Sequence, residues 1–429
     1  MHPDHSARSK LDRRQYLRHF LIILSGNGAA QVLNLLGYPF LARLYSPHEF
    51  GLFGIFVAAT SVAGMVACGR FEFAIPTAPK WGVRGVLWLS ILISAAIAAI
   101  STCGAAIYWW ASPTVGPAFP FLLGLCVFLT GVCVATSLFI MRHDDFRAVA
   151  ASVLVRTATA ILSQIALAFV AAGAVSLAAG FTLGLVSQAI FLVALTWRRL
   201  NPGPPRKRAI LAMLARYRRQ VSVDFPSTLV AAVALNILTF ALAALYDPGI
   251  VGFYSIGNRL AVVPLALFND ALAQVFFQKA SRAKEQKGHL WDEVKFSLLT
   301  SGLLSLGVFV AIVLFARPFI SVFLGERWLP AADMLIILAP MLAVRGLSMS
   351  IATTVFVLRS AHWLFVHNVA TVVLPLIAFA LAHVFHLGPI AFLGIASVLL
   401  FFEYAMFGGF LVLAARRGVR PRSKLDATR

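Results

Sequence analysis

Long apolar runs recur from one end of this chain to the other, and they limit its possible folds more than any other feature. Each approaches the ~20 residues that an α-helix needs to cross a bilayer, and 60% of the 429 residues are hydrophobic. Lipid offers the backbone no hydrogen bonds, so apolar runs of this length cross it as helices. The sequence therefore predicts an all-α, polytopic membrane protein with twelve spans, at about residues 18–42, 49–69, 84–110, 117–141, 149–172, 174–197, 222–246, 249–278, 290–316, 331–358, 360–385 and 388–414.

The formal net charge of +20 follows the alternation of these spans. If the N-terminus is cytosolic, 28 of the 36 Lys and Arg residues fall in cytosolic segments, and only Arg43, Arg317 and Arg327 fall in outer loops. This asymmetry matches the positive-inside rule and predicts that both termini are cytosolic. The charge therefore requires no nucleic-acid partner, and the basic segments are suited to contact anionic lipid headgroups.

A short motif occurs twice, and each copy joins two apolar runs. Leu44-Tyr45-Ser46-Pro47 is matched 201 residues later by Leu245-Tyr246-Asp247-Pro248, and Gly51 and Gly252 follow at the same spacing. A duplicated half is the simplest explanation. We interpret the proline as the residue that ends the first span of each pair, because its ring cannot continue a helix. The glycine would allow close packing as the next span begins.

The predicted boundary between the two halves is a segment rich in proline, glycine and basic residues. Asn201-Pro202-Gly203-Pro204-Pro205 and the basic run behind it separate six predicted spans from six. This composition suits a loose connection. We expect an N-terminal six-helix lobe, a loose cytosolic basic linker, a C-terminal six-helix lobe and a basic cytosolic tail, at residues 1–199, 200–220, 221–415 and 416–429.

Polar residues line one face of the first span. Asn27, Gln31 and Asn34 follow one another at helical spacing, with Tyr38 one turn further on. Such a stripe is costly against lipid, so it faces either a neighbouring helix or a hydrated cavity.

Charged residues within spans cost about 2.5–3.5 kcal/mol each on insertion scales, so each requires a reason. Arg70 and Glu72 lie near the cytosolic end of span two, where an ion pair or snorkelling is sufficient. Arg156 lies further into span five, and Arg259 and Arg345 are the deepest. Either the two deepest arginines bind an anionic ligand, or they pair with acidic residues. The acidic candidates for pairing or ion coupling are Asp270, Glu403 and Asp224.

Several segments together form a family pattern: Ser25-Gly26-Asn27, Pro39 to Pro47, Arg70-Phe71-Glu72, Asn258-Arg259-Leu260, and Leu324-Gly325-Glu326 with Trp328. In these residues the chain resembles bacterial polysaccharide or O-antigen flippases, a family within the multidrug/oligosaccharidyl-lipid/polysaccharide exporter superfamily. The resemblance extends from Ser25 to about the twelfth span.

The resemblance implies two six-helix lobes around a central cavity, related by an axis along the membrane normal. It implies a protein of the bacterial inner membrane whose cargo is a polyprenyl-diphosphate-linked oligosaccharide, with membrane lipids, a glycan polymerase and chain-length proteins as partners. Arginine offers phosphate a forked pair of donors. We therefore expect cargo to contact Arg345, Arg259, Arg156, Arg43, Asn27, Gln31, Asn34 and Asn258.

No sequence motif points to chemistry on the cargo. The chain has no Walker loop, acidic metal cluster or nucleophile motif, so we expect no enzyme activity, cofactor or metal. His383 and His386 have no third ligand nearby in sequence, which favours an interfacial role. The four cysteines are interpreted as small buried hydrophobes. Transport would then be driven by an ion gradient or by downstream consumption of the product.

Two other classes of protein remain open. A multidrug or peptidoglycan-precursor exporter of the same superfamily would share the duplication, but deep arginines repel cationic drugs. A membrane glycan polymerase or ligase would need a large outer loop with convergent Arg, His or acidic residues. The longest outer connections, near 111–117 and 316–330, are too short for that. A duplicated helical half also favours alternating access over catalysis.

Overall fold

The computed structural model describes residues 26–111, 116–199, 207–262, 265, 291–357 and 362–417, and within these ranges it is helical nearly throughout and contains no β-strand. Ten of the described helices are long and apolar enough to cross a membrane. Helices over residues 26–44 and 248–262 occupy the predicted first and eighth spans. The predicted all-α, polytopic membrane class is confirmed.

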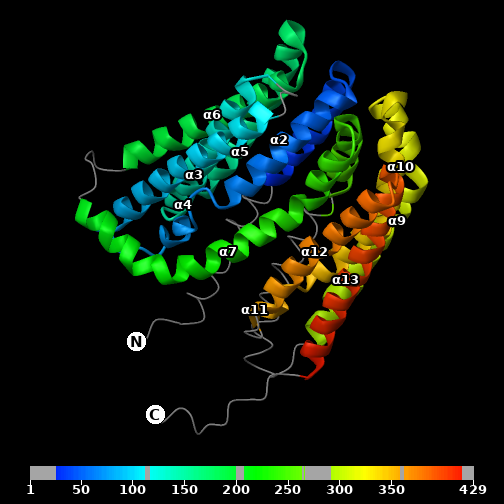
Figure 1. Cartoon of the computed structure of the whole chain (residues 1–429). Helices are drawn as coiled ribbons and strands as arrows, with labels where there is room; N and C mark the ends of the chain where they lie inside the picture. The colour runs from blue at the N-terminus through cyan, green and yellow to red at the C-terminus, as the bar shows by residue number, and fades with distance from the viewer. Residues whose placement is uncertain are drawn as a thin grey trace. The chain divides into compact units, whose positions relative to one another are not determined.

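The chain divides into two compact units, residues 1–232 and 233–429. Besides the helix over 26–44, the helical elements of the first unit are α2 (Pro47–Met65), η1 (Phe71–Ala74), α3 (Val83–Ala111), α4 (Ala118–Met141), α5 (Phe146–Ala171), α6 (Ala174–Arg199) and the start of α7 (Lys207–Leu245). Those of the second are the end of α7, α9 (Trp291–Phe323), η2 (Glu326–Trp328), α10 (Leu329–Ser350), α11 (Thr354–Val357), α12 (His362–Val384) and α13 (Pro389–Arg417) (Figure 1).

Small residues let the helices of the first unit approach closely. α3 packs on α4, and α6 packs on both α4 and α5. A Cβ atom added at Gly184 of α6 would lie 2.6 Å from the carbonyl oxygen of Arg156 on α5, and one added at Gly180 would lie 2.5 Å from Cγ of Gln164. Glycine is therefore required at these crossings, as is common between membrane helices.

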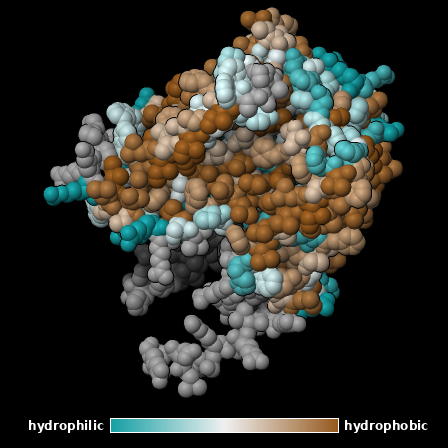
Figure 2. Space-filling model, viewed as in Figure 1, coloured by the Kyte–Doolittle hydropathy of each residue, from teal (hydrophilic) through white to brown (hydrophobic). Residues whose placement is uncertain are grey.

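Apolar side chains also cover the outside of the helices. On α9 of the second unit, Leu303 is 75% exposed, and Leu299 and Leu306 are more than half exposed. Figure 2 shows hydrophobic residues over much of the visible surface. In water such a surface would be an aggregation liability, whereas in a bilayer it lies against lipid tails.

The two copies of the repeated motif adopt the same local structure. Tyr45 and Tyr246 each follow the end of a helix, and Pro47 and Pro248 each lie at the start of the next one. The predicted role of the proline was therefore wrong in detail, because it begins a helix instead of ending one. Backbone N–H groups in the first turn of a helix have no partner within the helix, so proline loses no hydrogen bond there. Its fixed φ is also the value that the helix needs.

Each of these turns is closed by an oxygen-bearing side chain and a tyrosine. Ser46 caps α2 in a reciprocal pair with Glu49, while the Asp247 carboxylate accepts a hydrogen bond from the backbone N–H of Gly249 at 2.7 Å. The Tyr45 hydroxyl donates to the carbonyl of Gln164 on α5 at 2.7 Å, and the Tyr246 hydroxyl donates to the carbonyl of Leu387 at 2.8 Å. This agreement supports the duplication.

Much of the predicted loose linker is helical. Residues 207–220 belong to α7, which continues into the predicted seventh span. Met213 is 1% exposed, and its sulfur would lie 2.7 Å from a Cβ atom at Gly82. A Cβ atom at Gly85 would lie 3.0 Å from the carbonyl oxygen of Ala209. Composition suggested a solvated basic segment, but its apolar positions pack on the start of α3. Residues 200–206 and the tail from 418 lie outside the described residues.

Candidate functional site

The polar stripe of the first predicted span lies on the helix over residues 26–44. Asn27 is exposed, whereas Gln31 and Asn34 are partly buried. Among the described residues none of these three amides has a hydrogen-bond partner, although Tyr38 on the same helix has one contact or more. Amides that remain available for hydrogen bonding fit a hydrated surface better than a sealed helix contact.

Arg43 is exposed at the end of the same helix, one turn before Pro47. Arg156, on α5, is partly buried, and its charge lies near the thiol of Cys133 on α4. Within the described part of the chain, no carboxylate lies within ion-pair distance of either arginine. Both cations are therefore available to an anion, but no described contact brings the two together.

Arg345 is partly buried on α10 of the second unit, in aromatic surroundings. Its charge interacts with the phenols of Tyr254, on the helix over 248–262, and Tyr404, on α13. The Ser348 hydroxyl, one turn from Arg345, donates to the carbonyl of Tyr404 at 2.6 Å. A Cβ atom at Gly408 would lie 2.7 Å from that hydroxyl oxygen, so α10 and α13 are in close contact where the arginine lies.

Two more predicted cargo contacts lie on the helix over 248–262. Asn258 and Arg259 are both partly buried there, and Arg259 has at least one polar or charged contact. Asp270, the acidic residue expected on the same helix face, lies outside the described residues. Asp224 is partly buried on α7, in the first unit. The cargo-binding role of all these residues remains a prediction.

Glu403 forms a pair that sequence reasoning missed. Its carboxylate oxygen Oε1 lies 2.6 Å from Nδ1 of His367 on α12, and the two side chains are 7% and 5% exposed. The suggested ion pair between Glu403 and Arg345 is not formed among the described residues, and the carboxylate pairs with the imidazole of His367 instead. A lone histidine inside an apolar run was the only sequence signal, and a buried structural histidine gives the same signal.

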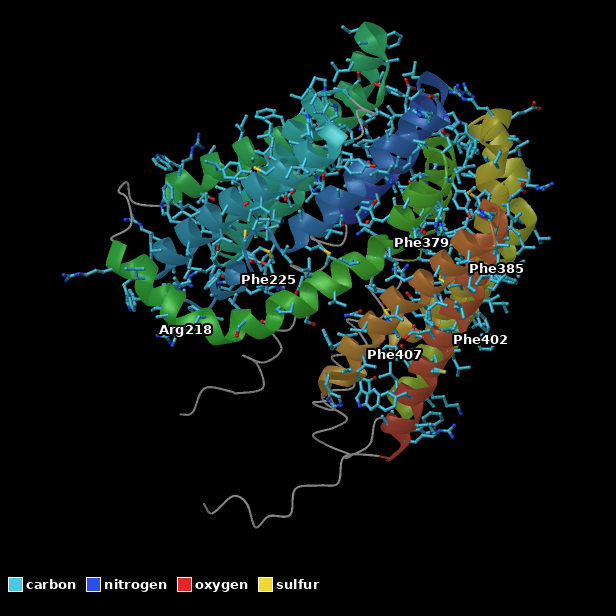
Figure 3. All side chains as sticks on the ribbon, in the orientation of Figure 1. Arg218, Phe225, Phe379, Phe385, Phe402 and Phe407 are labelled. Atoms are coloured by element: carbon cyan, nitrogen blue, oxygen red, sulfur yellow. The ribbon has the colours of Figure 1, made fainter. Side chains whose placement is uncertain are left out.

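Aromatic rings enclose this pair. The His367 ring stacks on Phe407, with centroids 4.1 Å apart and planes at 15°, and lies edge-on to Tyr404 at 5.4 Å. Phe407 belongs to α13 and is labelled in Figure 3. The second carboxylate oxygen of Glu403, Oε2, is buried with no hydrogen-bond partner among the described residues.

A second buried carboxylate lies in the first unit, just beyond α2. Glu72, in η1, is 4% exposed at its side chain and lies 3.7 Å from the guanidinium of Arg70. Burial raises the pKa of Glu72, and the positive charge of Arg70 offsets part of that rise. Of the two alternatives that the sequence left open, an ion pair or snorkelling, the ion pair is present. Arg142, at the C-terminal end of α4, donates to the carbonyls of Ile75 and Pro76, which fixes the chain beyond η1.

The histidines and cysteines considered for metal binding lie apart. His383 and His386 are both exposed at the end of α12, and the described residues contain no group of three His, Cys, Asp or Glu side chains that could hold a metal ion. Cys68, Cys126 and Cys133 are buried as expected, but Cys103 is exposed on α3. The prediction of a buried cysteine is therefore wrong at Cys103.

The chemistry available in the second unit is recognition of charge. A partly buried guanidinium with two neighbouring phenols can bind an anion through charge-assisted hydrogen bonds. The pair of His367 and Glu403 lies next to one of these phenols, because Glu403 and Tyr404 are adjacent in sequence. The described residues thus place a guanidinium on α10 and a histidine–carboxylate pair on α12 and α13 of one unit.

Comparison with solved structures identifies the fold. A lipid II flippase, MurJ, in an inward closed conformation matches with a TM-score of 0.70 at 14% identity, covering 92% of this chain and 87% of that one. An inward-facing multidrug resistance MATE family transporter of the MOP superfamily matches with a TM-score of 0.62 at 16% identity, covering 90% and 94%. At these identities the likeness concerns the fold alone.

A third solved structure has the same fold. It is a MOP superfamily transporter from Pyrococcus furiosus, described as having a binding pocket of reverse polarity, with a TM-score of 0.61, 14% identity and coverage of 94% and 95%. No curated protein sequence matches the chain. A family model described as "Polysaccharide biosynthesis protein" matches residues 40–333. These residues include both copies of the repeated motif, and the chain therefore belongs to the polysaccharide biosynthesis protein family, with the fold of MOP superfamily transporters.

Proposed function

We propose that this protein is a flippase that moves a polyprenyl-diphosphate-linked oligosaccharide repeat unit across the bacterial cytoplasmic membrane. The product would serve the assembly of O-antigen, capsule or exopolysaccharide. Membership in the polysaccharide biosynthesis family and the transporter fold support the general role. Movement would occur by alternating access, in which one half of a duplicated transporter rocks against the other around a fixed site.

The proposal rests mainly on the surroundings of Arg345. It lies on a membrane-crossing helix, is partly buried, and has no carboxylate partner among the described residues. A cation kept in a span without a counter-ion is costly unless a ligand supplies the negative charge. A diphosphate does so, and the guanidinium can hold two of its oxygens at once. A cationic drug would be repelled from the same place.

Substitution of the deep arginines tests this role. In a strain whose chromosomal copy is deleted, we expect plasmid-borne Arg345→Ala and Arg259→Ala to abolish surface polysaccharide and to leave the lipid-linked repeat unit on the cytosolic side. Arg345→Lys should restore part of the export, because it keeps the charge and loses the fork. Arg317→Ala is the matched control, since Arg317 is exposed and paired with Asp333.

Immunoblots of the membrane fraction must show equal protein for all variants. Normal surface polysaccharide in both alanine variants would refute the assignment of these arginines. Rescue of a strain depleted of its own lipid II flippase, with no effect on surface polysaccharide, would instead favour a peptidoglycan precursor as cargo.

The orientation requires its own test. We propose that both termini and the 200–220 segment face the cytosol and that the 111–117 connection faces the periplasm, because basic residues gather on one side of the predicted spans. Single cysteines placed in these segments would be treated with a membrane-impermeant maleimide on intact cells. Labelling at 111–117 only is the expected result, and labelling within 200–220 would overturn the orientation.

A further inference from the structure

The pair formed by His367 and Glu403 has the properties of a proton-binding site. The two side chains come from different helices, are more than nine-tenths buried, and share a short hydrogen bond of 2.6 Å. Oε2 of the carboxylate has no partner in the described part of the chain. A proton can therefore bind the pair at this oxygen without breaking an existing hydrogen bond. With neutral imidazole the pair carries one negative charge, and one proton makes it neutral whichever group holds it.

The groups that face the pair are few. On α13 the neighbour is Tyr404, whose phenol feels the charges of both Glu403 and Arg345. Arg345 comes from α10, and Tyr254, from the helix over 248–262, interacts with both Arg345 and Tyr404. α11 has no ionisable residue. On α9, Asp292 and Lys295 lie near its first residue and Arg317 near its last. Tyr404 is thus the shared neighbour of the acid–base pair and the deep arginine.

The groups at this site suit a proton better than a metal cation. Sodium, like other hard cations, prefers several oxygen ligands, whereas the described residues offer one carboxylate, and one of its oxygens already binds an imidazole nitrogen. Imidazole gains or loses a proton in the physiological range more readily than any other unperturbed side chain. Within a membrane span, such ionisable pairs are typical of proton relays.

We propose that His367 and Glu403 bind a proton, and that the charge of this pair is linked through Tyr404 to the affinity of Arg345 for a diphosphate. The linkage rests on the proposed function for its ligand, but the proton site itself does not. When the pair is negative it attracts the Arg345 guanidinium and opposes an incoming anion. When the pair is protonated, the full positive charge of Arg345 is available to the diphosphate.

The sign of the linkage follows from these charges. Protonation of the pair strengthens diphosphate binding, so by reciprocity diphosphate binding must draw a proton onto the pair. We therefore expect undecaprenyl diphosphate to bind on the order of tenfold more tightly at pH 6 than at pH 8, which lies within the usual range of coupling between two sites.

Calorimetry measures this linkage directly. Purified full-length protein in detergent is titrated with undecaprenyl diphosphate at one pH, in two buffers of different ionisation enthalpy, which gives the number of protons taken up per ligand bound. We expect net uptake by the wild type and none by His367→Gln or Glu403→Gln. His383→Gln is the matched control, because His383 lies on the same helix and is exposed. Equal uptake in wild type and His367→Gln would overturn the linkage.

The proton site is tested without any ligand. In protein with isotope-labelled histidine, the ring resonance that disappears in His367→Gln should change its chemical shift with pH in the wild type, and its titration should differ in Glu403→Gln. A His367 resonance that is constant from pH 5 to 9 would overturn the proton site. If that resonance titrates but undecaprenyl diphosphate does not bind, the proposed function and the linkage fail while the proton site stands.

Discussion

Glu72 in the first unit and Glu403 in the second are both buried carboxylates beside a nitrogen base, yet the partner differs. Glu72 lies by Arg70, a cation that keeps its proton at every physiological pH. Glu403 lies by His367, which can exchange one. Burial alone therefore does not make a carboxylate a switch. In the first pair only the carboxylate can gain or lose a proton, whereas in the second, under the proposal above, the base can do so as well.

Even the aromatic neighbours of the two pairs correspond. The guanidinium of Arg70 lies 4.1 Å from the ring centroid of Phe73, and the His367 ring lies 4.1 Å from that of Phe407. Phe73 is 49% exposed, whereas Phe407 is buried. The first pair is consequently less enclosed than the second, since the Arg70 side chain is 24% exposed and that of His367 is 5% exposed. Protonation changes in the enclosed pair act on nearby charges with less screening.

The largest expected effect comes from removing each carboxylate in turn. We expect Glu403→Gln to lower glycan export on the order of tenfold, because a neutral pair holds the cargo in the tightly bound form at every pH. Glu72→Gln should export at close to the wild-type rate. Export is read from surface polysaccharide in the complemented deletion strain at matched protein levels. If both variants export equally, the proposed distinction between the two pairs fails.

Exchanging the base should turn the second pair into a copy of the first. Lysine keeps its proton through the neutral range, so His367→Lys would pair Glu403 with a fixed charge. We expect export to fall several-fold, on the order of the lower end of typical coupling effects, and to lose its dependence on external pH between 6 and 8. An unchanged pH profile in this variant would contradict the role of the histidine. Its thermal unfolding in detergent shows whether the fold survives.

The first pair should affect stability and not transport. The pKa of Glu72 is raised by burial, so the folded state binds more protons than the unfolded state between the two pKa values. The free energy of unfolding should therefore be greatest below the unfolded pKa and fall as pH rises through the folded one. Thermal unfolding between pH 4 and 8 measures this, and the decline should be absent in Glu72→Gln. A wild-type curve that rises with pH through that window would refute it.

The smallest effects concern the aromatic neighbours. Phe73→Leu removes an exposed cation–π contact and should cost about 0.5–1 kcal/mol of stability. Phe407→Leu removes a buried ring stack and should cost about 0.5–1.5 kcal/mol beyond the change in buried area. Only Phe407→Leu should also alter the pH dependence of export, because Phe407 stacks on the imidazole of the proposed proton site, whereas Phe73 lies against a guanidinium. An altered pH profile in Phe73→Leu would weaken the comparison.

The sequence was sufficient for features that are local or periodic. Apolar run lengths predicted the helices, and the spacing of Leu44 to Pro47 and Leu245 to Pro248 predicted two equivalent turns. Arg70 and Glu72 lie two residues apart, so their ion pair could be expected. The role of proline was misassigned because the sequence does not show on which side of the turn a helix boundary falls.

Contacts between distant segments could not be predicted in the same way. His367 and Glu403 are 36 residues apart, and only the packing of α12 on α13 brings them together. The helical start of α7 was missed because its basic composition suggested a solvated linker, whereas Met213 and Ala209 pack against Gly82 and Gly85. Periodicity identifies a helix, but the partner of each helix face is set by the three-dimensional arrangement.

The tyrosine within each repeated turn has a consequence for how the protein is made. Burial raises the pKa of Tyr45 to about 12, with the carboxylate of Glu49 adding to the effect, and burial also raises the pKa of Tyr246. Both hydroxyls therefore remain donors in the cell. The Tyr45 hydroxyl donates a hydrogen bond to α5, and the Tyr246 hydroxyl donates one to the loop between α12 and α13. Each turn is therefore closed by residues of its own half. During synthesis the Tyr45 contact can form once α5 has left the ribosome, before the second half exists.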